Sequence, residues 1–165
     1  MSWSRRKVLW LPAAAALPLA TGCGFRLRGE APLPFRRFAL TGFAPRSPLA
    51  DALRDALLHN GAEEVPPARA ELILQALADA RERVVVASTT AAQVRELQLR
   101  VRLRWRTHTS AGREVTPPAE LVLTRDMSYS ESIALAKQHE EAALVRDMHA
   151  DLVAQVLRRL EAIRL

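Results

Sequence analysis

One stretch of this chain, residues 97–106, alternates strictly between apolar and polar side chains. Its apolar positions are Leu97, Leu99, Val101, Leu103 and Trp105, and its polar positions are Gln98, Arg100, Arg102, Arg104 and Arg106. A period of two places all the apolar side chains on one face of a β-strand and the polar ones on the other. The chain must therefore form a sheet whose apolar face is covered by other elements, which limits the folds open to it.

Two predicted helices can provide that cover. The first begins at Ser47-Pro48, because serine caps free amides and proline suits the first helical position, and it ends at Asn60-Gly61. A longer helix with a broad apolar stripe is expected from about Ser130 to Ile163. Further strands are expected at 38–42, at 120–125, and at 72–77 and 81–87, either as two strands or as one strand bent near Ala78.

The order of these elements, β-α-β-β-β-α, predicts an α+β fold. Two helices would pack on one face of a roughly four-stranded, mainly antiparallel sheet, which makes a two-layer sandwich. We expect a single domain over residues 38–165, preceded over residues 23–37 by an extended tether that contains several glycines, prolines and arginines.

The first 22 residues have the layout of a secretory signal. Three basic residues at 5–7 precede an apolar run at 8–20, and small residues precede Cys23, the only cysteine. This window is similar to the lipobox of bacterial lipoprotein precursors, so we expect cleavage after residue 22, with a diacylglycerol and an N-acyl lipid attached to Cys23. The alternatives are an ordinary signal peptide followed by a free thiol, and a signal-anchor helix. Pro12 and Pro18 interrupt the apolar run, which is shorter than the roughly 20 residues of a spanning helix, and this disfavours the anchor.

The polar face of the alternating strand carries what we call the arginine ladder, defined as Arg100, Arg102, Arg104 and Arg106. Successive side chains on one strand face lie roughly 7 Å apart, so these charges repel one another unless water, acids or an anion neutralises them. The ladder is either a solvated face that discourages edge pairing or a surface for phosphate groups, whose oxygens match the planar fork of arginine. Arg81 and Arg83 are expected on a neighbouring strand.

Enzymatic and nucleic-acid functions are disfavoured. The four histidines form no His-Glu-x-x-His zinc motif, and the sequence contains neither a glycine-rich phosphate loop nor a Gly-x-Ser-x-Gly motif. The formal charge is +6, but part of it belongs to the expected signal peptide, and the aromatic content of 5% provides few side chains for base stacking. We therefore expect no catalytic residue, no metal, no nucleic-acid partner and no cofactor apart from the lipid on Cys23.

Four segments are distinctive in their order and spacing. They are CGFRLRG at 23–29, LTRDMSY at 123–129, ALAK at 134–137 followed by Glu140-Glu141, and RDM at 146–148 with the helix after it. Together they resemble the LptE family of lipopolysaccharide-assembly lipoproteins, and the resemblance covers the whole mature chain. It implies the same arrangement of two helices against a small sheet.

The resemblance also implies a function. Members of the family are outer-membrane lipoproteins that face the periplasm, plug the large β-barrel LptD, assist its assembly and bind lipopolysaccharide on its way to the cell surface. Gly24, directly after the expected lipid-bearing cysteine, is compatible with delivery to the outer membrane. The alternatives are a lipoprotein scaffold for another envelope complex and an anchored periplasmic hydrolase that uses His108, His139 and His149.

The resemblance places a lipopolysaccharide-binding lysine at Lys137, in the Ala-Leu-Ala-Lys run. The family also uses a basic residue in the loop between the middle strands, but here that loop, 88–90, has no positive charge. Arg83 or Arg95, on either side of the loop, could substitute for it. The remaining candidates for lipopolysaccharide contact are the ladder residues Arg100, Arg102 and Arg104.

Overall fold

The computed structural model describes residues 33–90 and 93–164. The expected signal peptide, the lipid attachment at Cys23 and most of the expected tether lie outside the described residues and remain predictions.

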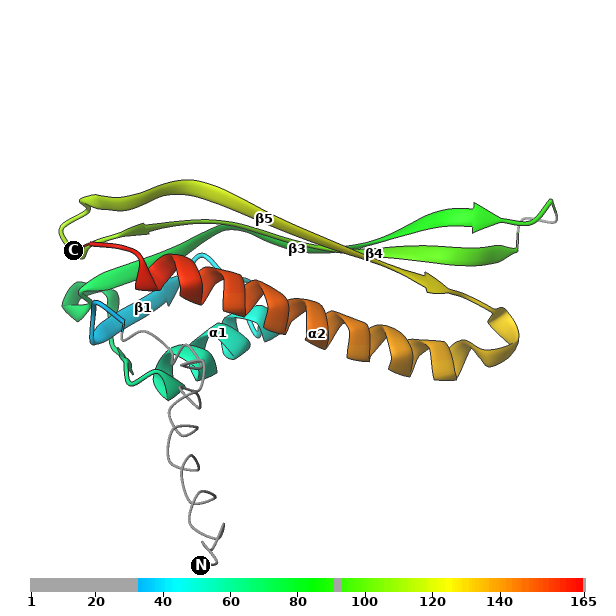
Figure 1. Cartoon of the computed structure of the whole chain (residues 1–165), viewed down its shortest axis with the longest axis horizontal. Helices are drawn as coiled ribbons and strands as arrows, with labels where there is room; N and C mark the ends of the chain where they lie inside the picture. The colour runs from blue at the N-terminus through cyan, green and yellow to red at the C-terminus, as the bar shows by residue number, and fades with distance from the viewer. Residues whose placement is uncertain (1–32, 91–92, 165) are drawn as a thin grey trace, which may run out of the picture. The chain divides into compact units, whose positions relative to one another are not determined.

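The described residues form two helices and a five-stranded sheet, which confirms the predicted α+β class (Figure 1). The strands are β1 (Arg37–Thr41), β2 (Glu63–Glu64), β3 (Leu72–Ser88), β4 (Val94–His108) and β5 (Glu114–Ser128). Their order across the sheet is β2-β1-β3-β4-β5.

The sheet differs from the prediction in strand number and direction. The short strand β2 is a fifth member that sequence periodicity does not reveal, because two consecutive glutamates carry no alternation. Strand β1 pairs in parallel with both β2 and β3, whereas β3, β4 and β5 are antiparallel. The parallel pairing follows from the helix between β1 and β3, because a crossover helix returns the chain to the same end of the sheet.

Strands β3, β4 and β5 are long and irregular in register. Strand β3 is one continuous strand of 17 residues, and its register against β4 shifts between Ala76 and Ala78, close to the expected bend. Pro117 and Pro118 lie within β5, where the register against β4 also shifts, and β5 is an edge strand that tolerates their missing amides. The predicted strand covered only residues 120–125, and the observed strand extends further in both directions.

The outer edge of β3 is only partly occupied. Strand β1 pairs with β3 as far as Gln75, and among the described residues no strand pairs with this edge beyond that point. Val84, Val85 and Val86 near the end of β3 are 40%, 53% and 53% exposed. This end of the sheet thus presents both free backbone groups and apolar side chains.

Both helices cover the same face of the sheet (Figure 1). Helix α1 (Pro48–His59) begins as predicted, with the Ser47 hydroxyl accepting a hydrogen bond of 3.1 Å from the Ala50 amide. A 3-10 turn, η2 (Glu131–Ile133), precedes α2 (Ala134–Glu161), so the expected long helix starts slightly later than predicted. Neither helix of the described chain combines the length and apolarity that a membrane crossing requires.

The main core lies between the sheet and the helices. Its β4 members are the apolar half of the alternating strand, Leu97, Leu99, Val101, Leu103 and Trp105, all at most 5% exposed. Helix α2 contributes Met148, Leu152, Val156 and Leu160, which are fully buried as the stripe predicted. A smaller cluster of Ala39, Ala70 and Ile73 packs separately from the main core near the β1 end of the sheet, under the 3-10 turn η1 (Pro67–Arg69).

Gly42 fixes the chain reversal after β1. Its φ is +77°, a left-handed conformation, and a Cβ at this position would clash with the backbone carbonyl oxygen of Ala76 on β3. Only glycine therefore allows the backbone to pass this close to the bulge in β3.

Candidate functional site

The strand register divides the basic residues of β3 and β4 between the two faces of the sheet. Arg81 pairs with Val101 and Arg83 pairs with Leu99, and both partners are buried under the helices. Directly opposed residues project from the same face, so Arg81 and Arg83 point toward the helices. The arginine ladder occupies the alternate positions of β4 and projects from the open face. The two sets are on neighbouring strands, as expected, but they do not form one surface.

The arginine ladder is incompletely neutralised. Arg100 and Arg102 each have a carboxylate at 3.8 Å, from Glu82 and Glu120 respectively, and in each pair both side chains are nearly half exposed. Arg106 donates a 2.8 Å hydrogen bond to the side-chain oxygen of Gln75. Long, exposed pairs of this kind stabilise little. Arg104 has no ion-pair partner within 4 Å among the described residues, although Glu120 lies opposite it in the strand register, so the ladder is not fully paired.

Arg102 also contains a buried hydrogen-bond donor. Its Nε is buried and has no hydrogen-bond partner within the described part of the chain. A buried donor without a partner costs free energy, so this guanidinium gains stability if a ligand or a partner protein supplies an acceptor.

Arg81 and Arg83 share one carboxylate. Glu141 of α2 accepts a hydrogen bond from Arg81 and another, of 3.1 Å, from Arg83. The Glu141 side chain is 11% exposed, whereas the two arginine side chains are about half exposed. The cluster has one positive charge in excess, but Arg83 is already engaged in fixing α2 to the sheet.

Lys137 is also engaged. Its Nζ donates hydrogen bonds of 3.0 Å to the Ser128 hydroxyl and 2.7 Å to the Glu140 carboxylate, and its side chain is 13% exposed. An anion that binds Lys137 must therefore compete with Glu140. Lys137 lies about one helical turn before Glu141, so both polar anchors of α2 face the sheet.

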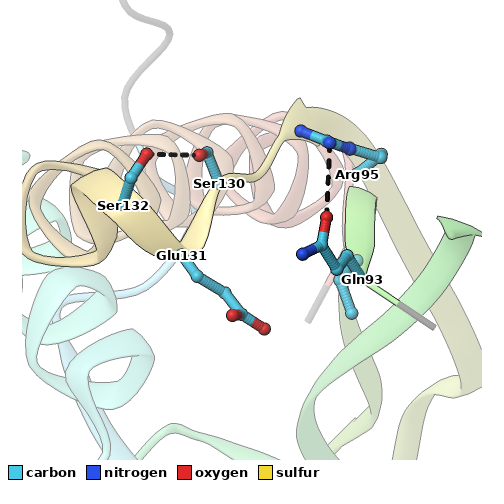
Figure 2. Close-up of a pocket in the computed structure, with 6 residues that line it drawn as sticks. Gln93, Arg95, Ser130, Glu131 and Ser132 are labelled. Atoms are coloured by element: carbon cyan, nitrogen blue, oxygen red, sulfur yellow. Dashed lines mark hydrogen bonds between the residues drawn. The ribbon is translucent and has the colours of Figure 1, made fainter. Parts of the chain in front are cut away.

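Arg95 borders a separate polar pocket of about 340 Å³, shown in Figure 2. The pocket lies between the start of β4 and η2, and Arg95 donates a 3.4 Å hydrogen bond to the side chain of Gln93. Glu131 also lines the pocket, and the hydroxyls of Ser130 and Ser132 are 2.8 Å apart. The lining contains one arginine and one carboxylate, so this pocket has no excess positive charge to attract an anion.

The six predicted lipopolysaccharide contacts therefore do not converge. The open face carries Arg100, Arg102 and Arg104. On the other face, Lys137 belongs to α2 and Arg83 contacts α2 through Glu141. Arg95 lies at the start of β4. Sequence reasoning missed Glu141, which connects two of the arginines. The signal for it was present, because Glu141 precedes Val145, Met148 and Leu152 at helical spacing and so occupies a stripe position.

The histidines of the hydrolase interpretation lie apart. His108 ends β4, where its Nδ1 is 2.9 Å from the Thr109 carbonyl oxygen. His139 is exposed near the start of α2, and His149 is buried roughly 15 Å further along that helix, at 1.5 Å rise per residue. No group of three potential metal ligands occurs within the described ranges. These side chains do not share a site.

Comparison with known families and structures gives consistent results. The family described as "LptE: Lipopolysaccharide-assembly" matches residues 35–160. The chain is similar to the solution structure of an uncharacterized lipoprotein B from Nitrosomonas europaea, with 32% identity, a TM-score of 0.70, and coverage of 84% of this chain and 91% of that one. Comparison with curated proteins gives no match.

Two further structures share the fold. A minor lipoprotein from Acinetobacter baumannii has 23% identity and a TM-score of 0.66, with coverage of 79% of this chain and 94% of that one. The rare lipoprotein B from Shewanella oneidensis has 20% identity and a TM-score of 0.61, with coverage of 76% and 93% respectively.

Proposed function

The chain belongs to the LptE lipopolysaccharide-assembly family, and from this premise we propose that it is an outer-membrane lipoprotein that plugs an LptD-type β-barrel. In this role it assists assembly of the barrel and binds lipopolysaccharide during delivery to the cell surface. Cys23 carries the lipid anchor, and the domain faces the periplasm. The family is a non-enzymatic assembly component, and the proposal assigns no catalytic step to this chain.

The observation that carries the proposal is the arginine ladder on the face of the sheet that the helices do not cover. Both helices pack on one face, whereas the other face presents the ladder together with Val122, which is 47% exposed. A surface that combines loosely paired arginines with an exposed apolar side chain suits a partner that offers acidic groups or phosphates beside apolar ones. The wall of a barrel and the lipid it transports both have this chemistry.

Lys137 supports the lipid-binding part of the proposal. Its ammonium is held in place by Ser128, and within the described part of the chain Glu140 is the one carboxylate that pairs with it. A phosphate group, which carries up to two negative charges, competes well with a single exposed carboxylate. The ladder residues Arg100, Arg102 and Arg104 provide a second basic surface on the other side of the sheet.

Co-purification tests the proposal. The full-length chain, tagged at its C-terminus and extracted in detergent from the outer membrane of its host, is expected to bring a large β-barrel protein with it. Arg104→Glu is expected to reduce the yield of the barrel, because it reverses a ladder charge that has no ion-pair partner in the described structure. Arg113→Glu is the matched control, because it reverses an exposed charge in the β4–β5 turn.

Recovery of the wild-type chain without any barrel partner would contradict the plug role. Recovery with a different envelope protein would favour the scaffold alternative. Mass spectrometry of the same material tests the anchor separately: we expect a mature chain that begins at a triacylated Cys23, and Cys23→Ser should remain unacylated.

A further inference from the structure

A basic cavity lies on the helix side of the sheet, further along α2 than Lys137. Its volume is about 440 Å³, and it is formed by the segment before α1, the middle of β3 and the middle of α2. Its α2 lining runs from Ala142 to His149, which lie 5 and 12 positions after Lys137, or roughly 8 and 18 Å along the helix. The proposed function uses none of the side chains that are specific to this cavity.

The charged residues of the cavity come from three separate segments. Arg46 precedes α1, Arg81 and Asp79 belong to β3, and Arg146 belongs to α2. Arg46 and Arg146 are exposed and make no ion pair within the described part of the chain. Arg81 is paired with Glu141, so the positive charge that no carboxylate offsets within 4 Å is that of Arg46 and Arg146.

The lining carboxylate is already occupied. Asp79 accepts a 2.5 Å hydrogen bond from the Ser47 hydroxyl, which also accepts the bond from the Ala50 amide. Asp79 is therefore held at the first turn of α1, where the positive end of the helix dipole reduces the effect of its charge. The two unpaired arginines are left for a ligand.

His149 points to a ligand independently of the arginines. Its side chain is buried, with the residue 9% exposed, yet it lines the cavity and makes no hydrogen bond to any described residue. Neither ring nitrogen is fully enclosed, although neither has a hydrogen-bond partner in the described residues. The polar edge of the ring therefore reaches the cavity. A buried polar ring in the wall of a basic cavity is suited to donate a hydrogen bond to an anion there.

The remaining lining is apolar. Ala44, Pro45, Pro48, Ala142 and Val145 form the rest of the wall. Arginine forks bind phosphate oxygens in a bidentate manner, and a phosphate monoester carries nearly the two negative charges needed to offset the positive excess.

We propose that the cavity bounded by Arg46, Arg146 and His149 binds a phosphate monoester, with the guanidinium groups on its oxygens and the imidazole as an additional donor. The apolar wall receives the organic group that carries the phosphate. This site goes beyond the proposed function and does not depend on Lys137 or on the arginine ladder.

Calorimetric titration of the full chain tests the proposal with dodecyl phosphate below its micellar concentration, and with inorganic phosphate. Dodecyl phosphate is expected to bind. The double variant Arg46→Ala/Arg146→Ala is expected to weaken binding by at least about tenfold, since each charge-assisted hydrogen bond contributes on that scale. The double variant Arg69→Ala/Arg113→Ala, which removes two exposed arginines elsewhere, is expected to leave the affinity within about twofold of the wild type.

The source of the phosphate is distinguished by comparing the two probes. Tighter binding of dodecyl phosphate supports an amphiphile, and equal binding of inorganic phosphate supports a free anion at the same site. Dodecyl maltoside or dodecanoate binding as tightly as dodecyl phosphate would overturn the phosphate assignment, and dodecanoate would indicate a carboxylate ligand instead.

NMR provides a site-specific readout that does not depend on the arginine variants. The ring signal of His149, assigned by its loss in His149→Gln, is expected to shift on addition of dodecyl phosphate, while the signals of His59 and His139 stay in place. An unmoved His149 signal at saturating probe would overturn the inference. Because lipopolysaccharide binding through Lys137 is measured separately, loss of one result leaves the other intact.

Discussion

Arg83 of β3 and Glu141 of α2 form an ion pair of 3.1 Å that joins the sheet to the long helix. The contact lies where apolar packing is thin. In the first two turns of α2, the residues that are at least partly buried are Ala134, Lys137 and Glu141, and Leu135 is 70% exposed. The start of α2 is therefore attached by polar contacts, whereas its later turns are attached by the core.

Replacing Glu141 tests this attachment. Glu141→Gln removes the charge that neutralises Arg81 and Arg83, and we expect a loss of about 1–2 kcal/mol in the free energy of unfolding, less than for a fully buried pair because the arginines are half exposed. Urea denaturation provides the measurement. Glu140→Gln, which removes an exposed carboxylate one position earlier, is expected to cost no more than about 0.5 kcal/mol. Equal effects of the two variants would contradict the anchoring role.

Substitutions at Lys137 and at Glu140 are expected to change the affinity for lipopolysaccharide in opposite directions. Lys137→Gln is expected to weaken the binding of lipopolysaccharide by the purified chain several-fold while the domain, whose core lies in the later turns of α2, stays folded. Glu140→Gln is expected to strengthen binding, because it removes the carboxylate that competes for the Lys137 ammonium at 2.7 Å. A binding assay on immobilised protein checks both variants. If neither variant changes binding, Lys137 does not belong to the site.

The stability of the domain should depend on His149 below neutral pH. Burial lowers the pKa of His149, a nearby Asp79 carboxylate partly opposes this, and Arg81 adds to the lowering. The folded state thus binds a proton less readily than the unfolded chain, so the neutral ring contributes its full stability above the ordinary histidine pKa of about 6.5. This contribution is lost as the pH falls below that value and through the lowered pKa of the folded state.

Denaturation curves at pH values from about 7 to about 5 measure this effect, and His149→Gln should show a flatter dependence than the wild type. Arg46 and Arg146, which also line the cavity, act in the same direction as Arg81 by disfavouring the charged ring. His139→Gln is the control, because that ring is exposed. Parallel curves for wild type and His149→Gln would refute the prediction.

Gly42→Ala is expected to be the most damaging small substitution at the β1 end of the sheet. It adds a Cβ that meets the Ala76 carbonyl group and also forces a left-handed φ of +77° on alanine. We expect a loss of about 3 kcal/mol or more, or failure to fold. Gly112→Ala, at φ +82° with open space around the Cβ, should cost only about 1 kcal/mol. Thermal unfolding monitored by circular dichroism distinguishes the two.

The local elements were predictable because their signals are local. The alternation at 97–106, the Ser47-Pro48 start of α1 and the apolar stripe of α2 each reflect a single element with one buried face. The parallel pairing of β1 and the strand β2 were not predictable in the same way, since Glu63 and Glu64 join the sheet only through backbone bonds to a distant segment.

The sequence proposes candidates for the site but not their arrangement. It points to Lys137 and the arginines as candidates for lipopolysaccharide contact, but the face of each arginine depends on the register between β3 and β4. That register contains shifts at Ala76/Ala78 and at Val85/Ala87. The sequence did not predict the cavity at Arg46, Arg146 and His149, because its lining comes from segments about 100 residues apart. Its one local signal is a histidine, His149, at a buried position of the α2 stripe.

The two edges of the sheet differ in how readily they can pair with an additional strand. On β5, Pro117 and Pro118 withdraw two amide donors, so an additional chain segment finds an incomplete set of partners there. On β3, the residues from Ala76 onward include no proline, and three exposed valines lie near the end of the strand. Concentrated, partner-free protein should therefore self-associate through the β3 border, and a single lysine in place of Val85 should keep it monomeric.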